Sequence, residues 1–292
     1  MSISDRPLIA VFGSNWQQRY FDSLKEFFAR LTQMPVRVCV ERAFGLYLRA
    51  HGFSLDDCDL VGAMPHDASM VISIGGDGTF LRAVDWIEAY PIPVMGINTG
   101  HLGYLAGFSL GKPEEVEAAL RGRYDESRRM VIEVKGDMIP TGFRPYALNE
   151  IAVAKGDTTS MVSIRAYVDG RFVADYLADG LIVSTPTGST AYNLSCGGPI
   201  LQPTMQSIIL TPIAPHSLTL RPIVVAAESE ITLEVSSRGE SCHVGVDGRT
   251  VCIPSDGRTL RICRAPFSVT VAQPPATDFA STLRAKLGWA SR

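Results

Sequence analysis

Residues 75–79, GGDGT, place one carboxylate among three glycines and a threonine, directly after the apolar run 71–74. Glycines permit tight backbone geometry and a close approach to a phosphate, and the N–H groups that open a following helix receive anions. A carboxylate beside phosphates is destabilised by charge repulsion, so its presence in this turn calls for a functional or structural reason. Asp77 could cap the helix, hold a metal ion that bridges phosphates, or accept a proton from an attacking hydroxyl, and the turn alone leaves all three interpretations open.

A second polar turn lies within residues 179–201, DGLIVSTPTGSTAYNLSCGGPIL. A strand-like segment leads into residues 186–190, PTGST, and a short helix follows. Such a hydroxyl-rich loop offers donors and backbone groups to a polar ligand. Serine, threonine and glycine also favour ordinary capped turns, so both interpretations stay open here.

A third polar feature is the pair Asn149 and Glu150, which interrupts the apolar segment 147–155. Adjacent side chains of a regular strand point to opposite faces, so both reach one ligand only near a strand end or a bulge. A polar pair inside a core strand needs partners. The alternative is a pair at a strand edge that faces water.

The first part of the chain alternates strand-like and helix-like segments. This alternation predicts a parallel sheet, whose ligands bind beyond the carboxyl ends of the strands, and the GGDGT turn stands at such an end. We expect strands at 7–13, 36–40, 70–74 and 92–98, and amphipathic helices at 20–31, 79–90 and 113–124.

From about residue 128 the pattern changes to short segments with a period of two, which predicts a β-rich domain. The pairs Asp169-Gly170 and Asp247-Gly248 predict tight hairpin turns. The pattern of residues 278–290 again predicts a helix. We expect a Rossmann-like α/β domain with a parallel sheet over residues 1–128, and a β-sandwich-like domain over residues 129–272. Residues 273–292 would return to the first domain as a C-terminal helix.

Composition narrows the classes of partner. The net charge is -3 and no block of Lys or Arg stands out, so we expect small-molecule substrates and no nucleic acid. The N-terminus does not read as a signal peptide, and the apolar stretches are shorter than the roughly 20 residues of a membrane span, so we expect a cytoplasmic protein without membrane contact.

Several known site patterns are missing from the sequence. The six cysteines form no CxxC pair and show no metal-ligand spacing, so reduced thiols and no metal-ligating residues are expected. No GxxxxGK[ST] segment is present, which excludes a P-loop. No GxGxxG follows the first strand, which argues against a dehydrogenase.

Taken in order, five segments resemble the NAD kinase family, which transfers a phosphoryl group from ATP to the 2'-hydroxyl of the adenosine ribose of NAD. Of these, 179–201 is the most specific, whereas the GGDGT turn is shared with diacylglycerol and sphingosine kinases and, as a near variant, with phosphofructokinases. The segments are GGDGT (75–79), GINTGHLGYL (96–105), LNEIAV (148–153), the 179–201 segment and PIAPHSLTLRPIV (212–224).

The resemblance assigns roles to matching positions. It makes Asp77 the general base, and it makes Asn149 and Glu150 the pair that fixes ribose hydroxyls or the adenine edge. Arg82, one helical turn beyond the glycine turn, either reaches a phosphate or is an exposed structural arginine. The remaining implied nucleotide-binding residues are Gly75, Gly76, Gly78, Thr79, Asp179, Thr187, Thr190, Ala191, Tyr192, Asn193, Leu194 and Ser195.

The resemblance also implies substrates, a cofactor and an assembly. NAD and ATP are the substrates, and a divalent cation, Mg²⁺, arrives with ATP. NAD is expected in a cleft between an α/β and a β-rich domain, in a homodimer or homotetramer. A lipid or sugar kinase that shares the GGDGT turn, and a catalytically silent NAD-binding sensor, are the alternatives.

Overall fold

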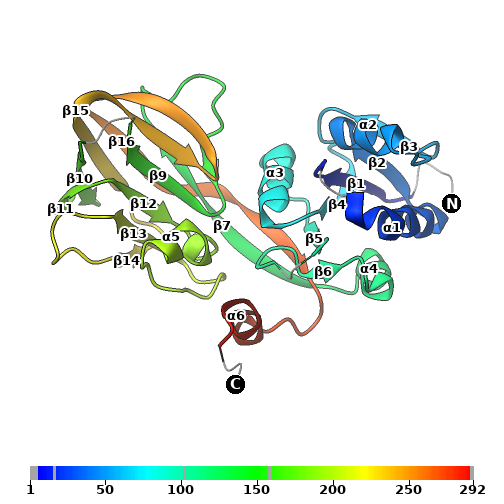
Figure 1. Cartoon of the computed structure of the whole chain (residues 1–292). Coiled ribbons are helices and arrows are strands. Elements are labelled where there is room, and N and C mark those ends of the chain that lie inside the picture. The colour runs from blue at the N-terminus through cyan, green and yellow to red at the C-terminus, as the bar shows by residue number, and fades with distance from the viewer. Residues whose placement is uncertain (1–5, 16–17, 101–102, 157–159, 290–292) are drawn as a thin grey trace. The chain divides into compact units, whose positions relative to one another are not determined.

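The computed structural model describes residues 6–15, 18–100, 103–156 and 160–289 of the 292-residue chain. The chain forms two compact units, Met1–Arg128 with Val269–Arg292 and Arg129–Ser268 (Figure 1). The backbone passes from one unit to the other inside β7 (Asp125–Lys135) and inside β16 (Arg249–Gln273). The first unit is therefore built from two separate stretches of sequence.

The first unit is an α/β structure with a parallel sheet, as predicted. Its strands run in the order β3-β2-β1-β4-β5, and residues Val271 and Ala272 of β16 pair with β5 in the same parallel sense. The chain order reverses on the two sides of β1, so β1 and β4 flank a topological switch point. The strands are β1 (Leu8–Gly13), β2 (Arg37–Glu41), β3 (Cys58–Val61), β4 (Ala68–Ile74), β5 (Val94–Asn98) and β6 (Phe108–Ser109).

Helices pack on this sheet through apolar faces. Helix α1 buries Leu24, Phe27, Phe28 and Leu31, whose spacing gave the helix prediction. The helix α2 and the strands β3 and β6 lie outside the predicted set, and all three are short. The helices of the unit are α1 (Phe21–Gln33), α2 (Arg42–Ala50), α3 (Asp77–Ile87), α4 (Pro113–Leu120) and the C-terminal α6 (Phe279–Leu287).

The second unit is rich in antiparallel strands, again as predicted. The long strand β15 (Ile231–Val246) pairs with β10 through its first half and with β9 through its second half. A buried apolar cluster that includes Tyr176 and Ile253 fills the interior. The other strands are β8 (Tyr146–Ala147), β9 (Glu150–Lys155), β10 (Val162–Val168), β11 (Arg171–Ala178), β12 (Gly180–Ser184), β13 (Ser207–Ile213) and β14 (Ile223–Ala226).

Two Asp-Gly pairs form the hairpin turns that their sequence predicts. Asp169 and Gly170 join β10 to β11, with φ of 50° and 73°. Asp247 and Gly248 join β15 to β16, with φ of 47° and 83°. Positive φ at both central positions is the geometry of a type I′ turn, which asparagine, aspartate and glycine adopt at least cost.

Among the described residues, no helix is both long and apolar enough to span a bilayer. The six cysteines form no disulfide in the described structure.

Candidate functional site

The glycine turn joins β4 to α3 with backbone geometry that needs glycine at its first position. Gly75 has φ of 150°, and a Cβ there would collide with Oγ1 of Thr79. Gly76 is the N-cap of α3 and makes no side-chain cap, while Gly76 and Gly78 have open space where a Cβ would be. Helix α3 thus begins with a bare, accessible backbone, which suits a phosphate.

Asp77 is the first residue of α3, and its carboxylate accepts hydrogen bonds from a neighbouring loop. Its Oδ2 accepts the N–H of Tyr104 at 2.9 Å. Its Oδ1 accepts the N–H groups of Leu105 at 3.0 Å and Ala106 at 3.3 Å. Since the side chain makes no cap on its own helix, the capping interpretation of Asp77 is wrong. The charge instead holds the loop over the glycine turn.

The loop around Asp77 also depends on a glycine. A Cβ at Gly103 would overlap Oδ1 of Asp77, so any other residue there would displace the carboxylate or the loop. Among the described residues, Oδ2 accepts one backbone N–H, and an ionised carboxylate offers about four lone-pair positions, so Asp77 keeps room for a further hydroxyl or cation. The proton-acceptor and metal interpretations both remain compatible with this geometry.

Asn149 and Glu150 lie where their sequence pattern requires, at a strand end. Strand β9 begins at Glu150, and Asn149 precedes it. The carboxylate of Asp247, at the tip of the β15–β16 hairpin, accepts the N–H groups of Leu148 at 2.6 Å, Asn149 at 2.9 Å and Glu150 at 3.0 Å. One hairpin aspartate therefore fixes the backbone of the whole segment. Sequence reasoning recognised the turn but not this contact.

Two carboxyl groups are crowded together here, and both resist ionisation. Burial raises the pKa of Glu150 to about 8; the negative charge of Asp247 acts in the same direction, and the N–H of Tyr192 opposes it. Burial raises the pKa of Asp247 to about 6, although the backbone N–H groups that its carboxylate accepts act to lower it. Glu150 is the group that carries a proton at neutral pH, and a protonated carboxyl can donate a hydrogen bond.

This raised pKa predicts how stability varies with pH. Folding favours the neutral form of Glu150, so its contribution is fully present below pH 4.5 and is lost as the pH rises through about 8. Glu150→Gln stays neutral and should therefore unfold at a higher temperature than wild type at pH 9, by about 2–4 °C for a change on the order of 1 kcal/mol, and at a similar temperature at pH 5.

Thermal unfolding at the two pH values measures this difference. Glu230→Gln, which alters an exposed glutamate of the same unit, is the control and should show no such pH dependence. An equal shift at pH 5 and pH 9 in the Glu150 variant would contradict the assignment.

The PTGST loop and the residue before it pack against the backbone of Leu148 and Asn149. Thr185 donates from its hydroxyl to the Leu148 carbonyl at 2.5 Å and from its N–H to the Asn149 carbonyl at 2.9 Å. A Cβ at Gly188 would overlap that Asn149 carbonyl, so only glycine permits this approach. Within the described structure, Oγ1 of Thr187 and Oε2 of Glu150 are buried without a hydrogen-bond partner. Two such atoms in one loop cluster could bind a polar ligand or an ordered water.

The segment that follows is partly structural. Asn193 is fully buried; its amide donates to the carbonyls of Ser189 at 3.0 Å and Pro199 at 3.1 Å and accepts the Thr211 hydroxyl at 2.6 Å. Its side chain therefore holds the loop, and its predicted ligand contact stays a prediction. Tyr192 and Ser195 are exposed, whereas Thr190, Ala191 and Leu194 are half-buried.

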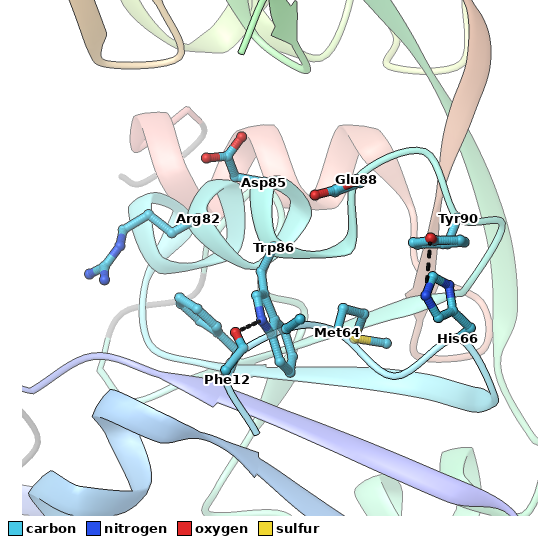
Figure 2. A pocket seen from close by; sticks show the side chains of 10 residues that line it. Phe12, Met64, His66, Arg82, Asp85, Trp86, Glu88 and Tyr90 are labelled. Atoms are coloured by element: carbon cyan, nitrogen blue, oxygen red, sulfur yellow. Dashed lines mark hydrogen bonds between the residues drawn. The ribbon is translucent and has the colours of Figure 1, made fainter. Parts of the chain in front are cut away.

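The two remaining predicted residues, Asp179 and Arg82, make contacts of other kinds. Asp179 pairs with Lys155 at 2.7 Å, at the far end of β9 from Glu150. Arg82 is exposed on α3, and its guanidinium carbon lies 5.5 Å from the centre of the Phe12 ring. Arg82 also lines a cavity with Trp86 (Figure 2). His101, within a segment quoted for the resemblance, lies outside the described residues.

Comparison with known proteins tests the resemblance independently. Residues 56–127 match the ATP-NAD kinase N-terminal domain, and residues 148–273 match the ATP-NAD kinase C-terminal domain. An NAD kinase of Bacteroides fragilis is 42% identical over 282 residues, which cover 96% of this chain and 97% of the relative. The chain belongs to the NAD kinase family. An NAD kinase of Porphyromonas gingivalis is 40% identical over 284 residues, with the same coverage of both chains.

Solved structures of the family agree with the fold. The crystal structure of an NAD kinase from Archaeoglobus fulgidus in complex with ATP has a TM-score of 0.72 and 26% identity, over 95% of this chain and 99% of that one. Yeast NADH kinase complexed with NADH has a TM-score of 0.86 at 24% identity, over 98% of this chain and 89% of that one. The α/β and β-rich architecture is thus the family's.

The donor atoms present allow a cation that arrives with a nucleotide. Among the described residues, no group of three or more His, Cys, Asp or Glu could hold a metal ion. Mg²⁺ needs no such cage, because it is usually bound by one or two carboxylates together with substrate phosphates. Asp77, beside the open glycine backbone, has room for either such a cation or a hydroxyl.

Proposed function

We propose that this chain catalyses the phosphorylation of NAD by ATP at the 2'-hydroxyl of the adenosine ribose, giving NADP. The observation that carries the proposal is the near-complete match to relatives named NAD kinase, 96% of the chain at 42% identity. The motifs with which the reaction would be performed lie in both matched segments, 56–127 and 148–273.

Asp77 is the proposed general base. A ribose hydroxyl is a poor nucleophile at neutral pH, so its proton must leave as the bond to phosphorus forms. Oδ2 of Asp77, with one backbone N–H bound to it at 2.9 Å, is oriented and retains one lone pair for that proton. The N–H groups of Gly76 and Gly78 are proposed to bind phosphate oxygens, in a turn whose shape depends on Gly75, whereas the Thr79 N–H donates to the Gly76 carbonyl at 3.0 Å.

The β-rich unit is proposed to bind NAD. Asn149 and Glu150 would bind its ribose or adenine, and the buried orphan atoms of Glu150 and Thr187 would gain partners when it binds. A protonated Glu150 donates a hydrogen bond to a ligand oxygen, which an ionised one cannot do. Asp179 and residues 190–195 are proposed as further NAD contacts, through backbone rather than side chain at Asn193.

The proposed cation is Mg²⁺ carried by ATP. When bound, it neutralises charge on the transferring phosphoryl group. Its ligands would be phosphate oxygens and water, because the proton of the ribose hydroxyl takes the lone pair of Asp77 that the three backbone N–H groups leave. We further propose that the reaction takes place in the cytoplasm.

One assay tests the reaction. Purified protein is incubated with NAD, ATP and Mg²⁺, and NADP is measured; formation of NADP with stoichiometric ADP is expected. A lipid or sugar kinase would give ADP only after its own acceptor is added, and a sensor would bind NAD without product. Absence of NADP would reject the proposed reaction.

We also propose that the chain forms a homodimer or homotetramer through strand β11. This strand pairs only with β10 among the described strands, and it exposes Phe172, Val173 and Leu177. An exposed apolar edge strand is a template for pairing with another copy.

Phe172→Glu should therefore lower the mass in solution. Light scattering is expected to give a multiple of the chain mass for wild type and a smaller multiple for the variant. Arg171→Glu, a neighbouring exposed charge, is the control for charge alone. An unchanged mass in the Phe172 variant would place the contact elsewhere.

A further inference from the structure

The C-terminal segment lies against the loop that holds Asp77. Nζ of Lys286, on α6, lies 5.6 Å from the centre of the Tyr104 ring. A Cβ at Gly107 would lie only 3.1 Å from Cδ of Pro274, so the chain that leads into α6 also packs closely on this loop. Both contacts lie within the first unit. The two separate stretches of sequence that build this unit therefore meet at the Asp77 loop.

Helix α6 is anchored by residues other than Lys286. Asp278 caps its first turn by accepting two backbone N–H groups, at 3.2 and 2.9 Å. Leu283 is buried, and Lys286, three positions further along, lies on the same face of the helix and is half-buried. A capped helix with a buried anchor thus carries the ammonium group to the Tyr104 ring.

Tyr104 connects α6 to the carboxylate. Its backbone N–H donates to Oδ2 of Asp77 at 2.9 Å, while its ring lies beside Nζ of Lys286. Burial raises the pKa of Tyr104, and the negative charge of Asp77 acts in the same direction, which places the tyrosine hydroxyl within the field of that carboxylate. The buried Asn98 amide donates to the Phe108 carbonyl at 2.8 Å and so fixes the end of the loop nearest β6. The contact with α6 supports the opposite end, at Tyr104.

The two cations in the last turn of α6 make different contacts. Arg284 is exposed and pairs with Asp278 of its own helix at 3.9 Å. Lys286 reaches the Tyr104 ring instead, where the negative face of an aromatic ring attracts an ammonium group. Of these two charges, only Lys286 can therefore influence the loop directly.

We propose that Lys286 is a positioning residue for the general base. The ammonium group holds the Tyr104 ring, the Tyr104 N–H holds Oδ2 of Asp77, and the carboxylate is thereby kept in place for the ribose hydroxyl. The inference rests on the proposed function, because it adds a residue to that reaction. Lys286 touches no substrate and acts through Tyr104. Exact placement matters, since a displacement of about 1 Å can cost as much as 10²-fold in rate.

A graded series of substitutions tests the assignment. Lys286→Gln should lower the kcat about two- to fivefold, the range expected for the loss of one cation–π contact. Lys286→Glu should lower it at least about fivefold, because the ring face repels an anion. Lys286→Arg keeps the cation and should rescue the kcat. The KM values for NAD and ATP should stay within about twofold of wild type throughout the series.

Arg284 supplies the matched control. Arg284→Gln and Arg284→Glu make the same changes of charge on the same helix, at an exposed side chain whose printed partner is Asp278. Neither variant should alter the kcat.

Amide hydrogen exchange, measured without nucleotides, reports on the loop independently of activity. The N–H groups of residues 104–106 are bound to Asp77, so a loosened loop should exchange them faster. Exchange should be near the wild-type rate in Lys286→Arg, faster in Lys286→Gln and fastest in Lys286→Glu. In a Tyr104→Leu background, which lacks the ring, Lys286→Gln should change neither the exchange nor the kcat further.

These measurements separate the positioning role from the reaction. If no NADP forms but the exchange follows the series, Lys286 still positions Asp77 and the proposed reaction is wrong. If wild type forms NADP and Lys286→Glu has the wild-type kcat, the positioning role is wrong and the function stands, whether or not the exchange or the stability in urea has changed. A raised KM for NAD at constant kcat would make Lys286 a binding residue and would also overturn the assignment.

Discussion

Asp77→Asn should reduce kcat by about 10²- to 10⁴-fold while the KM for NAD changes much less. The amide keeps the shape of the carboxylate but has no basic oxygen, and losses of this size are typical when a general base is removed. Asp22→Asn, at an exposed carboxylate in the first turn of α1, is the control and should leave kcat unchanged.

The structure adds a second effect that must be measured beside the first. Asp77 accepts N–H groups of Tyr104, Leu105 and Ala106, and an asparagine can accept with one atom only. The variant should lose about 1–3 kcal/mol of folding stability, seen in urea unfolding. A kcat within a few fold of wild type, together with the stability loss, would show that Asp77 holds the loop and does not take the proton.

Asp247→Asn should raise the KM for NAD by about tenfold or more, because Asp247 positions the Asn149–Glu150 segment. Its carboxylate fixes three consecutive backbone N–H groups, and an amide would set a donor against one of them. Small displacements of a binding pair are costly in catalysis, as much as 10²-fold for about 1 Å. Loss of the Asp247 charge also removes one cause of the raised pKa of Glu150.

The chain supplies a matched control for this variant. Asp169 occupies the corresponding hairpin position with φ of 50°, and its carboxylate accepts the N–H of Glu230 at 2.9 Å and the hydroxyl of Ser229 at 3.0 Å. Asp169→Asn should lower stability without changing the KM for NAD. The pH at which the Glu150→Gln stability difference develops should move down in the Asp247→Asn background. If both single variants leave the KM for NAD unaltered, Asp247 only closes its hairpin.

The fold was largely predictable because its patterns are local. The apolar spacing of α1 and the run that forms β4 are each visible within a dozen residues. The Asp-Gly turns are equally local, since positive φ restricts the residue types that fit. The short elements α2 and β3 gave too little periodic signal to be separated from loops.

The site was predictable as a set of motifs but not as a set of contacts. Asp247 reaches Leu148 across 99 positions, and Asp77 reaches Tyr104 across 27, so neither contact leaves a periodic trace in the sequence. Gly103 and Gly188 are fixed by close approach to another segment, which only the three-dimensional structure reveals. Asn193 is a case in which the sequence pattern suggested a ligand contact that its side chain does not leave room for. Its amide is hydrogen-bonded to Ser189 and Thr211 within the protein.

The discontinuous first unit has a consequence for how the protein is made. Its sheet includes Val271 and Ala272, and α6 belongs to the same unit, so these parts leave the ribosome after all of residues 129–268. The β-rich unit is a single stretch that can fold as soon as it has emerged. The α/β unit, although its larger part is synthesised first, must wait with Val94 and Met95 of β5 unpaired on the β16 side until Val271 and Ala272 have emerged. A released chain that ends at residue 268 should therefore carry a protease-resistant second unit and a protease-sensitive first one.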